Sequence, residues 1–308
     1  MSYQYTQTLV KRMHSLRQHV QEAGGSLSEE MPRYGTWTEG FGHWANAESH
    51  DGFTGFDYHL AGAALGLDYL LEDNVLAGVS YSESRADIRT DGDLSQGDVD
   101  SYFGSLYGSY FTGRRYVDTT LSYGRQGYGN VRQIDIGDLS TVAQSDHDGD
   151  LYSAYAETGC NLDVGRWVLQ PFAALRYLYL DEEGFRETGA GGANLVVGER
   201  KTDALISDLG LRLTRPFHKD SWLVIPELTA AWDHDFDIDD RTIVARFDGA
   251  PTTAFAIDSR DIDRDGVLLG AGLTLINKGR LNLAIHYIGE VRSHYDSQAV
   301  IGGLRYEF

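Results

Sequence analysis

Two tripeptides place an imidazole between carboxylates, a combination that hydrolases use for proton transfer. They are Asp146-His147-Asp148 and Asp233-His234-Asp235. A histidine beside a carboxylate can act as a general base. However, no serine stands in the G-x-S-x-G pattern that exposes a nucleophile in many hydrolases, and acidic segments produce Asp/His neighbours by chance. The sequence therefore predicts that the chain is not an enzyme, with a protease or esterase as an alternative.

A second acidic motif resembles the beginning of a calcium-binding loop. Asp261, Asp263, Asp265 and Gly266 have the spacing with which an EF-hand loop opens. The twelfth position of such a loop must be glutamate, but here it is Gly272. The single cysteine excludes a Cys-based zinc site. We therefore expect no metal and no cofactor.

A cluster of basic residues lies near the N-terminus, where Lys11, Arg12 and Arg17 lie close together. The apolar residues of this segment follow a helical period, with spacings of four, three and four. They are Leu9, Met13, Leu16 and Val20. The pattern predicts one amphipathic helix over about residues 3–23, closed by Gly24-Gly25, with a basic polar side.

The composition of the whole chain limits what it can bind. Its 308 residues include 46 acidic and 26 basic side chains, a formal net charge of −20. This excludes a general nucleic-acid binder, because phosphate recognition requires a surplus of lysine and arginine. The mean hydropathy of −0.35 is that of many soluble proteins. A transmembrane β-barrel has a similar value, because only alternate residues face lipid.

From about residue 33 onward, apolar and polar residues alternate, as they do in β-strands. For example, Val117, Leu121 and Tyr123 alternate with Asp118 and Ser122. The segments run for about 10 residues or more, whereas the average strand has about 5 to 6. Their polar face consists of glycine, serine, threonine and charged residues, which favours an enclosed polar lumen over a soluble β-sandwich.

The connections between these segments alternate between short and long. Tight turns are predicted at 72–74, 112–114, 163–166, 218–220 and 277–279, and polar loops at 48–54, 86–100, 130–150, 181–203, 233–265 and 293–298. Five turns and six loops connect twelve strands. The predicted fold is therefore all-β: a 12-stranded antiparallel transmembrane β-barrel over residues 33–308, preceded by a linker with the helix in residues 1–32.

Several aromatic and apolar residues fit particular positions in such a barrel. We interpret Trp167, Trp222, Tyr116 and Tyr123 as part of an aromatic girdle at the membrane boundary, although ordinary strand positions are an alternative. The last strand places its apolar residues on one face and ends the chain on phenylalanine. These residues are Val300, Leu304, Tyr306 and Phe308, and they predict the signal that the outer-membrane barrel-assembly machinery reads.

The chain resembles the C-terminal β-domain of autotransporters, the type V secretion family. The resemblance covers about residue 33 to the end. Among the segments that carry it are Gly55-Phe56-Asp57-Tyr58, Gly66-Leu67-Asp68-Tyr69, Pro226-Glu227-Leu228 and Gly303-Leu304-Arg305-Tyr306-Glu307-Phe308. It implies a twelve-stranded barrel in the outer membrane of Gram-negative bacteria, with an N-terminal α-helix inside the pore.

The resemblance gives the basic helix a function as a pore plug. Inside the pore, Lys11, Arg12 and Arg17 would be desolvated and would need partners. Candidate inward carboxylates are Asp68, Asp118, Glu157 and Asp208. The alternative is that the helix packs elsewhere as a solvated segment.

The family also implies the function and the partners. We expect a translocator that anchors in the outer membrane and exports an N-terminal passenger domain to the cell surface. The passenger, in cis, is expected to precede residue 1. The other expected partners are the barrel-assembly machinery, outer-membrane lipid and lipopolysaccharide, and we expect a monomer. The alternatives are a passive outer-membrane porin-like channel and an outer-membrane protease or esterase.

Overall fold

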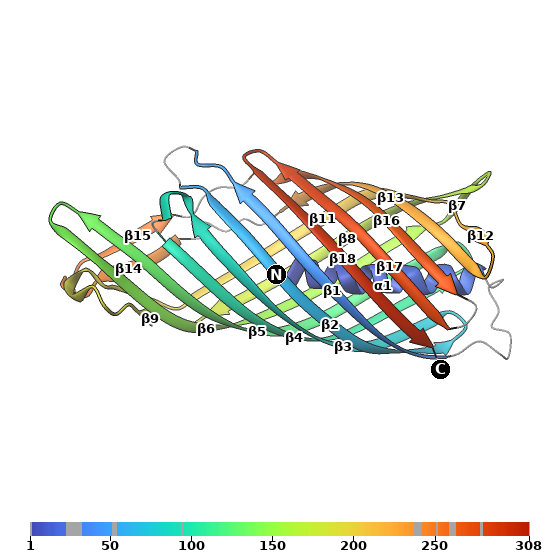
Figure 1. Cartoon of the computed structure of the whole chain (residues 1–308), viewed down its shortest axis with the longest axis horizontal. Coiled ribbons are helices and arrows are strands. Elements are labelled where there is room, and N and C mark those ends of the chain that lie inside the picture. The colour runs from blue at the N-terminus through green and yellow to red at the C-terminus, as the bar shows by residue number, and fades with distance from the viewer. Residues whose placement is uncertain are drawn as a thin grey trace.

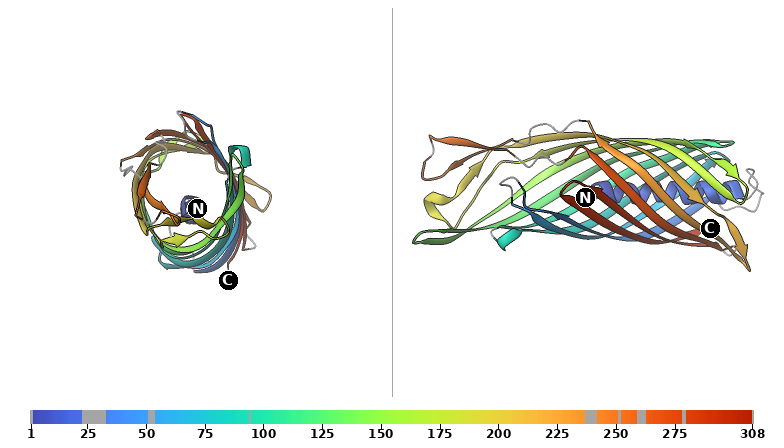
Figure 2. Two further views of the ribbon diagram at one scale, coloured as in Figure 1. Left: turned by 90° about the vertical axis from the view of Figure 1, so that its left-hand side faces the viewer. Right: turned by 90° about the horizontal axis from the view of Figure 1, so that it is seen from above.

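The computed structural model describes residues 2–22, 33–50, 54–93, 95–236, 242–250, 252–258, 263–277 and 280–307. It consists of a closed antiparallel barrel with one helix, α1 (Ser2–Glu22), in its interior. Figure 2 shows α1 inside the ring of strands when the barrel is viewed along its axis. The predicted fold class, including the helix inside the pore, is confirmed.

Twelve long strands form the wall, and each pairs with its neighbours along the chain. They are β1 (Tyr34–Ala47), β2 (Phe56–Glu72), β3 (Val75–Thr90), β4 (Ser95–Thr112), β5 (Arg115–Ile136), β6 (Leu139–Cys160), β8 (Trp167–Glu182), β11 (Arg200–Thr214), β13 (Trp222–Asp235), β16 (Asp265–Asn277), β17 (Leu281–Arg292) and β18 (Tyr295–Glu307). The first and last strands pair along their length, for example Gly42 with Val300, which closes the barrel. Closure leaves no free edge in the wall.

Shorter elements extend the two ends of the barrel. β7 (Leu162–Val164) and β12 (Phe217–Lys219) continue β6 and β11 at the end where the tight turns lie. At the opposite, loop end, β9 (Phe185–Arg186), β10 (Leu195–Val197), β14 (Thr242–Phe247) and β15 (Ala254–Asp258) form a separate four-stranded sheet. Figure 1 shows β14 and β15 at the end far from the C-terminus. Two 3₁₀ turns, η1 (Asp91–Asp93) and η2 (Gly191–Ala193), complete the elements.

The alternation of the sequence decides which side chains face outward. In β5, Leu121 is 61% exposed, whereas the preceding Thr120 is 2% exposed. Leucine, valine and tyrosine side chains are exposed in this way on the other long strands as well. An apolar outer face of this extent is expected against lipid rather than water. Within the described residues, no helix is long and apolar enough to cross a membrane.

One aromatic assignment made from the sequence is wrong. Trp167 and Tyr123 are exposed on the outer face, as a girdle requires, but Tyr116 is 2% exposed and points into the lumen. The physical reason is parity: Tyr116 lies an even number of residues from the inward Asp118 and Thr120, and in a strand such residues share a face. Its distance from the turn is irrelevant to the face.

Two of the predicted loops are mostly strand. The loop predicted at 130–150 lies within β5 and β6, which are joined at Gly137 and Asp138, where Gly137 has a φ of 60°. The loop predicted at 86–100 is reduced to the short link between β3 and β4. These strand ends extend past the apolar belt, where an outward face need not be apolar, so their polar sequence resembles a loop.

Glycines on the inner face leave space for large side chains of the adjacent strand. A Cβ atom on Gly78 would lie 2.1 Å from the ring of Tyr107, and one on Gly210 would lie 2.5 Å from the ring of Phe172. The aromatic rings therefore lie flat over neighbouring backbone, which accounts for part of the high glycine content. This arrangement leaves the centre of the lumen open for α1.

Candidate functional site

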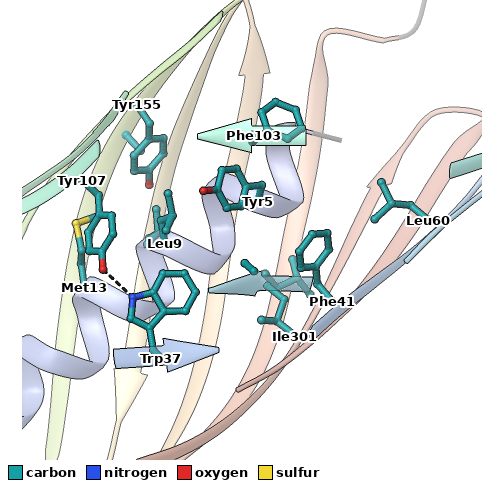
Figure 3. Close-up of a cluster of buried hydrophobic side chains, with 14 of the residues drawn as sticks. Tyr5, Leu9, Met13, Trp37, Phe41, Leu60, Phe103, Tyr107, Tyr155 and Ile301 are labelled. Carbon is teal, nitrogen blue, oxygen red and sulfur yellow. Dashed lines mark hydrogen bonds between the residues drawn. The ribbon is translucent and has the colours of Figure 1, made fainter. Parts of the chain in front are cut away.

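The apolar face of α1 packs against one side of the barrel wall. Tyr5, Leu9 and Met13 recur every four residues, so they share a helix face, and all three are buried. Figure 3 shows them beside aromatic side chains of the wall, which are Trp37, Phe103, Tyr107 and Tyr155. The Tyr5 and Phe103 rings lie 5.5 Å apart, and the hydroxyls of Tyr5 and Ser80 are hydrogen-bonded at 2.7 Å. This packing sets the rotation of the helix in the pore.

Arg12 binds Asp68 on β2. Its Nε and Nη2 donate hydrogen bonds of 2.9 and 2.8 Å to Asp68 Oδ2, and Arg305 of β18 donates one of 2.8 Å to Oδ1. All three side chains are buried. Asp68 thus joins the helix to the wall near the seam of the barrel, and Arg305 supplies it with a second cation.

Arg17 binds Asp118 on β5. Its Nη1 lies 2.7 and 2.8 Å from the two carboxylate oxygens, and 3.3 Å from Ser109 Oγ. The guanidinium carbon lies 3.6 Å from the centre of the Tyr116 ring, which is a cation–π geometry. The Arg17 side chain is 1% exposed, so this charge depends on Asp118 for compensation.

A third carboxylate, Glu227 on β13, contacts two helix residues. Lys11 Nζ lies 2.5 Å from Glu227 Oε1, and His14 Nδ1 lies 3.0 Å from Oε2. Residues three apart are neighbours on a helix surface, so one carboxylate can reach both. The three anchors lie on β2, β5 and β13, so they hold α1 from separate parts of the wall.

The remaining two predicted partners, Glu157 and Asp208, are bound by wall arginines in the structure. Glu157 accepts two hydrogen bonds of 2.7 Å from Arg212. It also accepts bonds of 2.7 Å from the hydroxyls of Tyr116 and Tyr155. Asp208 lies 3.7 Å from Arg176. These pairs neutralise wall charge without involving the helix cations.

Glu227 is the partner that reasoning from the sequence missed. It has the same strand parity as Leu223 and Ile225, which are inward and buried, so the alternation alone places it in the lumen. Its pairing with Lys11 depends on the height and rotation of the helix in the pore, and these cannot be predicted from a local sequence pattern.

Two small cavities lie beside the helix. One cavity of about 20 Å³ lies beside Lys11 and Arg12 near β17 and β18, and another of about 30 Å³ lies beside Gln7 and Lys11 near β8 and β11. A water molecule needs roughly 10 to 15 Å³ by this measure, so each cavity has room for one or two waters.

The residues of the last strand that were predicted as the assembly signal face outward where the structure describes them. Val300, Leu304 and Tyr306 are exposed, whereas the intervening Ile301 and Arg305 are buried. Phe308 lies outside the described residues. The pairing of β18 with both β17 and β1 places the outward residues at the seam of the barrel.

The two Asp-His-Asp tripeptides do not bring their own residues together. His147 and Asp233 are inward, whereas Asp148 and His234 are on the outer face, because neighbours in a strand point to opposite sides. His234 instead hydrogen-bonds Asp265 at 2.8 Å. No group of three or more potential metal ligands is found among the described residues, and Asp261 lies outside them.

Comparisons with known proteins are consistent with this geometry. The family model described as autotransporter beta-domain matches residues 36–288. The extracellular serine protease of Serratia marcescens is 28% identical over 279 residues, 89% of this chain and 26% of that protein. Outer membrane protein A of Rickettsia conorii is 24% identical over 288 residues, 89% of this chain and 14% of that protein. The chain thus spans about a quarter or less of these relatives.

Solved structures share the same fold. The translocator domain of the autotransporter NalP from Neisseria meningitidis has a TM-score of 0.74 at 17% identity, over 99% of this chain and 98% of that one. The beta domain of the Bordetella autotransporter BrkA has a TM-score of 0.66 at 20% identity, over 90% of this chain and 100% of that one.

Proposed function

Since this chain belongs to the autotransporter β-domain family, and is therefore a translocator of the Gram-negative outer membrane, we propose that α1 closes its pore once the attached passenger has been exported. The observation that carries the proposal is the set of buried contacts from Lys11, Arg12 and Arg17 to three separate strands. A solvated helix would gain little from such contacts. A helix that occupies the lumen needs them, because a buried charge without a partner is costly.

The passenger precedes the helix in this proposal. The family implies an attached passenger domain, and α1 runs through the lumen, so it lies where a chain would cross the membrane. Export would end with α1 in the pore, because its cations then meet Asp68, Asp118 and Glu227. The identity and activity of the passenger are properties of the upstream sequence.

The other partners follow from the outer surface. We propose that the outward Val300, Leu304 and Tyr306 form the surface that the barrel-assembly machinery reads, and that the exposed apolar belt contacts outer-membrane lipid and lipopolysaccharide around a monomer. Changing Leu304 to Asp tests the first part. We expect less heat-modifiable barrel in the outer membrane, and equal amounts would refute it.

Conductance tests the plug. A protease recognition sequence is inserted between residues 25 and 26, the full chain is folded and placed in a planar bilayer, and the cut peptide is removed. We expect low conductance before release and a large single-channel conductance afterwards. Equal conductance in the two states would reject the plug, and high conductance of the intact chain would favour a passive porin-like channel.

We propose that this chain catalyses no reaction itself. In support, His234 packs between Trp232 and Phe236, while Asp233 lies on the opposite face beside Arg176. Incubation of the purified barrel with peptide and ester substrates tests this. Turnover that disappears on His234→Ala would favour an outer-membrane protease or esterase instead.

A further inference from the structure

The carboxylates of the lumen differ in what neutralises them. Four of them lie within ion-pair distance of an arginine of the wall itself: Asp68 with Arg305, Glu157 with Arg212, Asp208 with Arg176, and Asp233 with Arg292. These pairs belong to the barrel and stay in place whether or not α1 occupies the pore. Arg292 and Arg305 also pair with the inward Glu290 and Glu307, so this part of the wall keeps a net negative charge that does not depend on α1.

Asp118 and Glu227 are neutralised by the helix instead. The polar contacts of Asp118 are with Arg17 and Ser109. Those of Glu227 are with Lys11, His14 and Thr229. Within the described part of the chain, no arginine or lysine of the wall lies in ion-pair distance of either carboxylate. Both therefore lose their ion-pair partners when the helix leaves.

We infer that the pore emptied of α1 is a cation-selective channel, and that Asp118 and Glu227 contribute to this selectivity once the helix has left. The inference rests on the proposed plug, because it concerns the state after the plug is removed. The two carboxylates lie on β5 and β13, in separate parts of the wall, and both side chains point into the lumen. Without the helix, each would add a negative charge to the water-filled pore. With α1 in place, the same charges anchor the helix.

The physical basis is an uncompensated negative potential in a narrow, low-dielectric tube. Clefts lined by charge of one sign concentrate counter-ions and repel co-ions. The effect depends on salt, since the Debye length is about 3 Å at 1 M and about 10 Å at 0.1 M. Selectivity should therefore be weak at high salt and should increase as the salt is diluted.

The reversal potential of the released pore tests this. The full chain with the cleavable linker is folded and cut, the peptide is removed with urea, and its loss is confirmed by mass spectrometry. Currents are then recorded across a KCl gradient. At low salt we expect K⁺ to be about fivefold more permeant than Cl⁻, the factor that corresponds to about 1 kcal/mol. Equal permeability, or a preference for Cl⁻, would overturn the inference.

Variants measure what the two carboxylates contribute to the selectivity. Asp118→Asn and Glu227→Gln, separately and together, should move the released pore toward equal permeability. Asp150→Asn is the matched control, because Asp150 pairs with Arg125 on the outer face, so it should leave selectivity unchanged. Full selectivity in the Asp118 and Glu227 variants would refute the assignment. A pore whose conductance does not rise on release would refute the plug as well, which separates the two failures.

Discussion

Asp118→Asn offers the sharpest test of how the helix is held. The substitution keeps the shape of the side chain but removes the charge that faces Arg17. Removing one partner of a buried ion pair costs about 3 to 5 kcal/mol. We expect the lower end here, because Arg17 reaches Asp118 through Nη1 alone and keeps Ser109 and the Tyr116 ring. A loss of about 3 kcal/mol raises the ratio of unplugged to plugged states about 100-fold.

Limited proteolysis measures that ratio. Trypsin cleaves at Lys11, Arg12 and Arg17, which are buried while α1 occupies the lumen, so the cleavage rate follows the population of the open state. Single-channel recordings give the same ratio, because the unplugged population equals the fraction of time that the channel is open. We expect Asp150→Asn to behave as the wild type, because its partner Arg125 is exposed.

A compensating variant completes the test. Replacing Arg17 by Met and Asp118 by Leu removes both charges, so no unpaired charge remains buried, and we expect most of the plugged population to return. If Asp118→Asn is cleaved no faster than the wild type, the ion pair does not hold the helix. If the double variant is as open as the single one, the cost does not come from an unpaired charge.

Three further predictions concern packing and membrane contact. Leu9→Ala should weaken plug binding by about 2 to 5 kcal/mol, because Leu9 is fully buried, and faster tryptic cleavage of the helix would reveal it. Gly78→Val should lower the temperature at which the barrel unfolds, as read from its heat-modifiable mobility in gels, because even a Cβ there would lie 2.1 Å from Tyr107. Adding Tyr107→Ala should relieve the defect. An unchanged unfolding temperature in Gly78→Val would contradict the packing. Leu121→Arg should destabilise the barrel in lipid vesicles by about 2 to 4 kcal/mol if Leu121 lies near the bilayer midplane; unfolding in urea measures this, and an unchanged midpoint would mean that Leu121 does not face lipid.

Much of the barrel can be predicted from local sequence. Strand alternation has a period of two residues, so the face of Leu121 or Asp118 follows from its parity alone. The number of strands follows from the order of short and long connections, because an antiparallel barrel alternates between its two ends. Tyr116 was assigned to the aromatic girdle although its parity places it in the lumen.

The ends of the strands were harder to predict from the sequence. β5 ends only at Ile136, and β6 begins at Leu139. Both strands therefore run through a polar segment that resembles a loop in the sequence. Beyond the lipid belt neither face must be apolar, so the alternation fades while the backbone pairing continues, as in Gln133 with Val142. Pairing of this kind depends on the neighbouring strand, which a local pattern does not include.

The sequence by itself determined that a basic helix precedes a barrel with an acidic interior, because charge and periodicity are local properties. It predicted Asp68, Asp118, Glu157 and Asp208 as lumen carboxylates, and strand parity gives Glu227 the same face. Only the tertiary structure decided among them, since the stagger of the strands fixes the height of each carboxylate and the packing of Leu9 and Met13 fixes the rotation of the helix. Arg212, which lies on a strand far along the chain, pairs with Glu157, whereas Glu227 pairs with Lys11 of the helix.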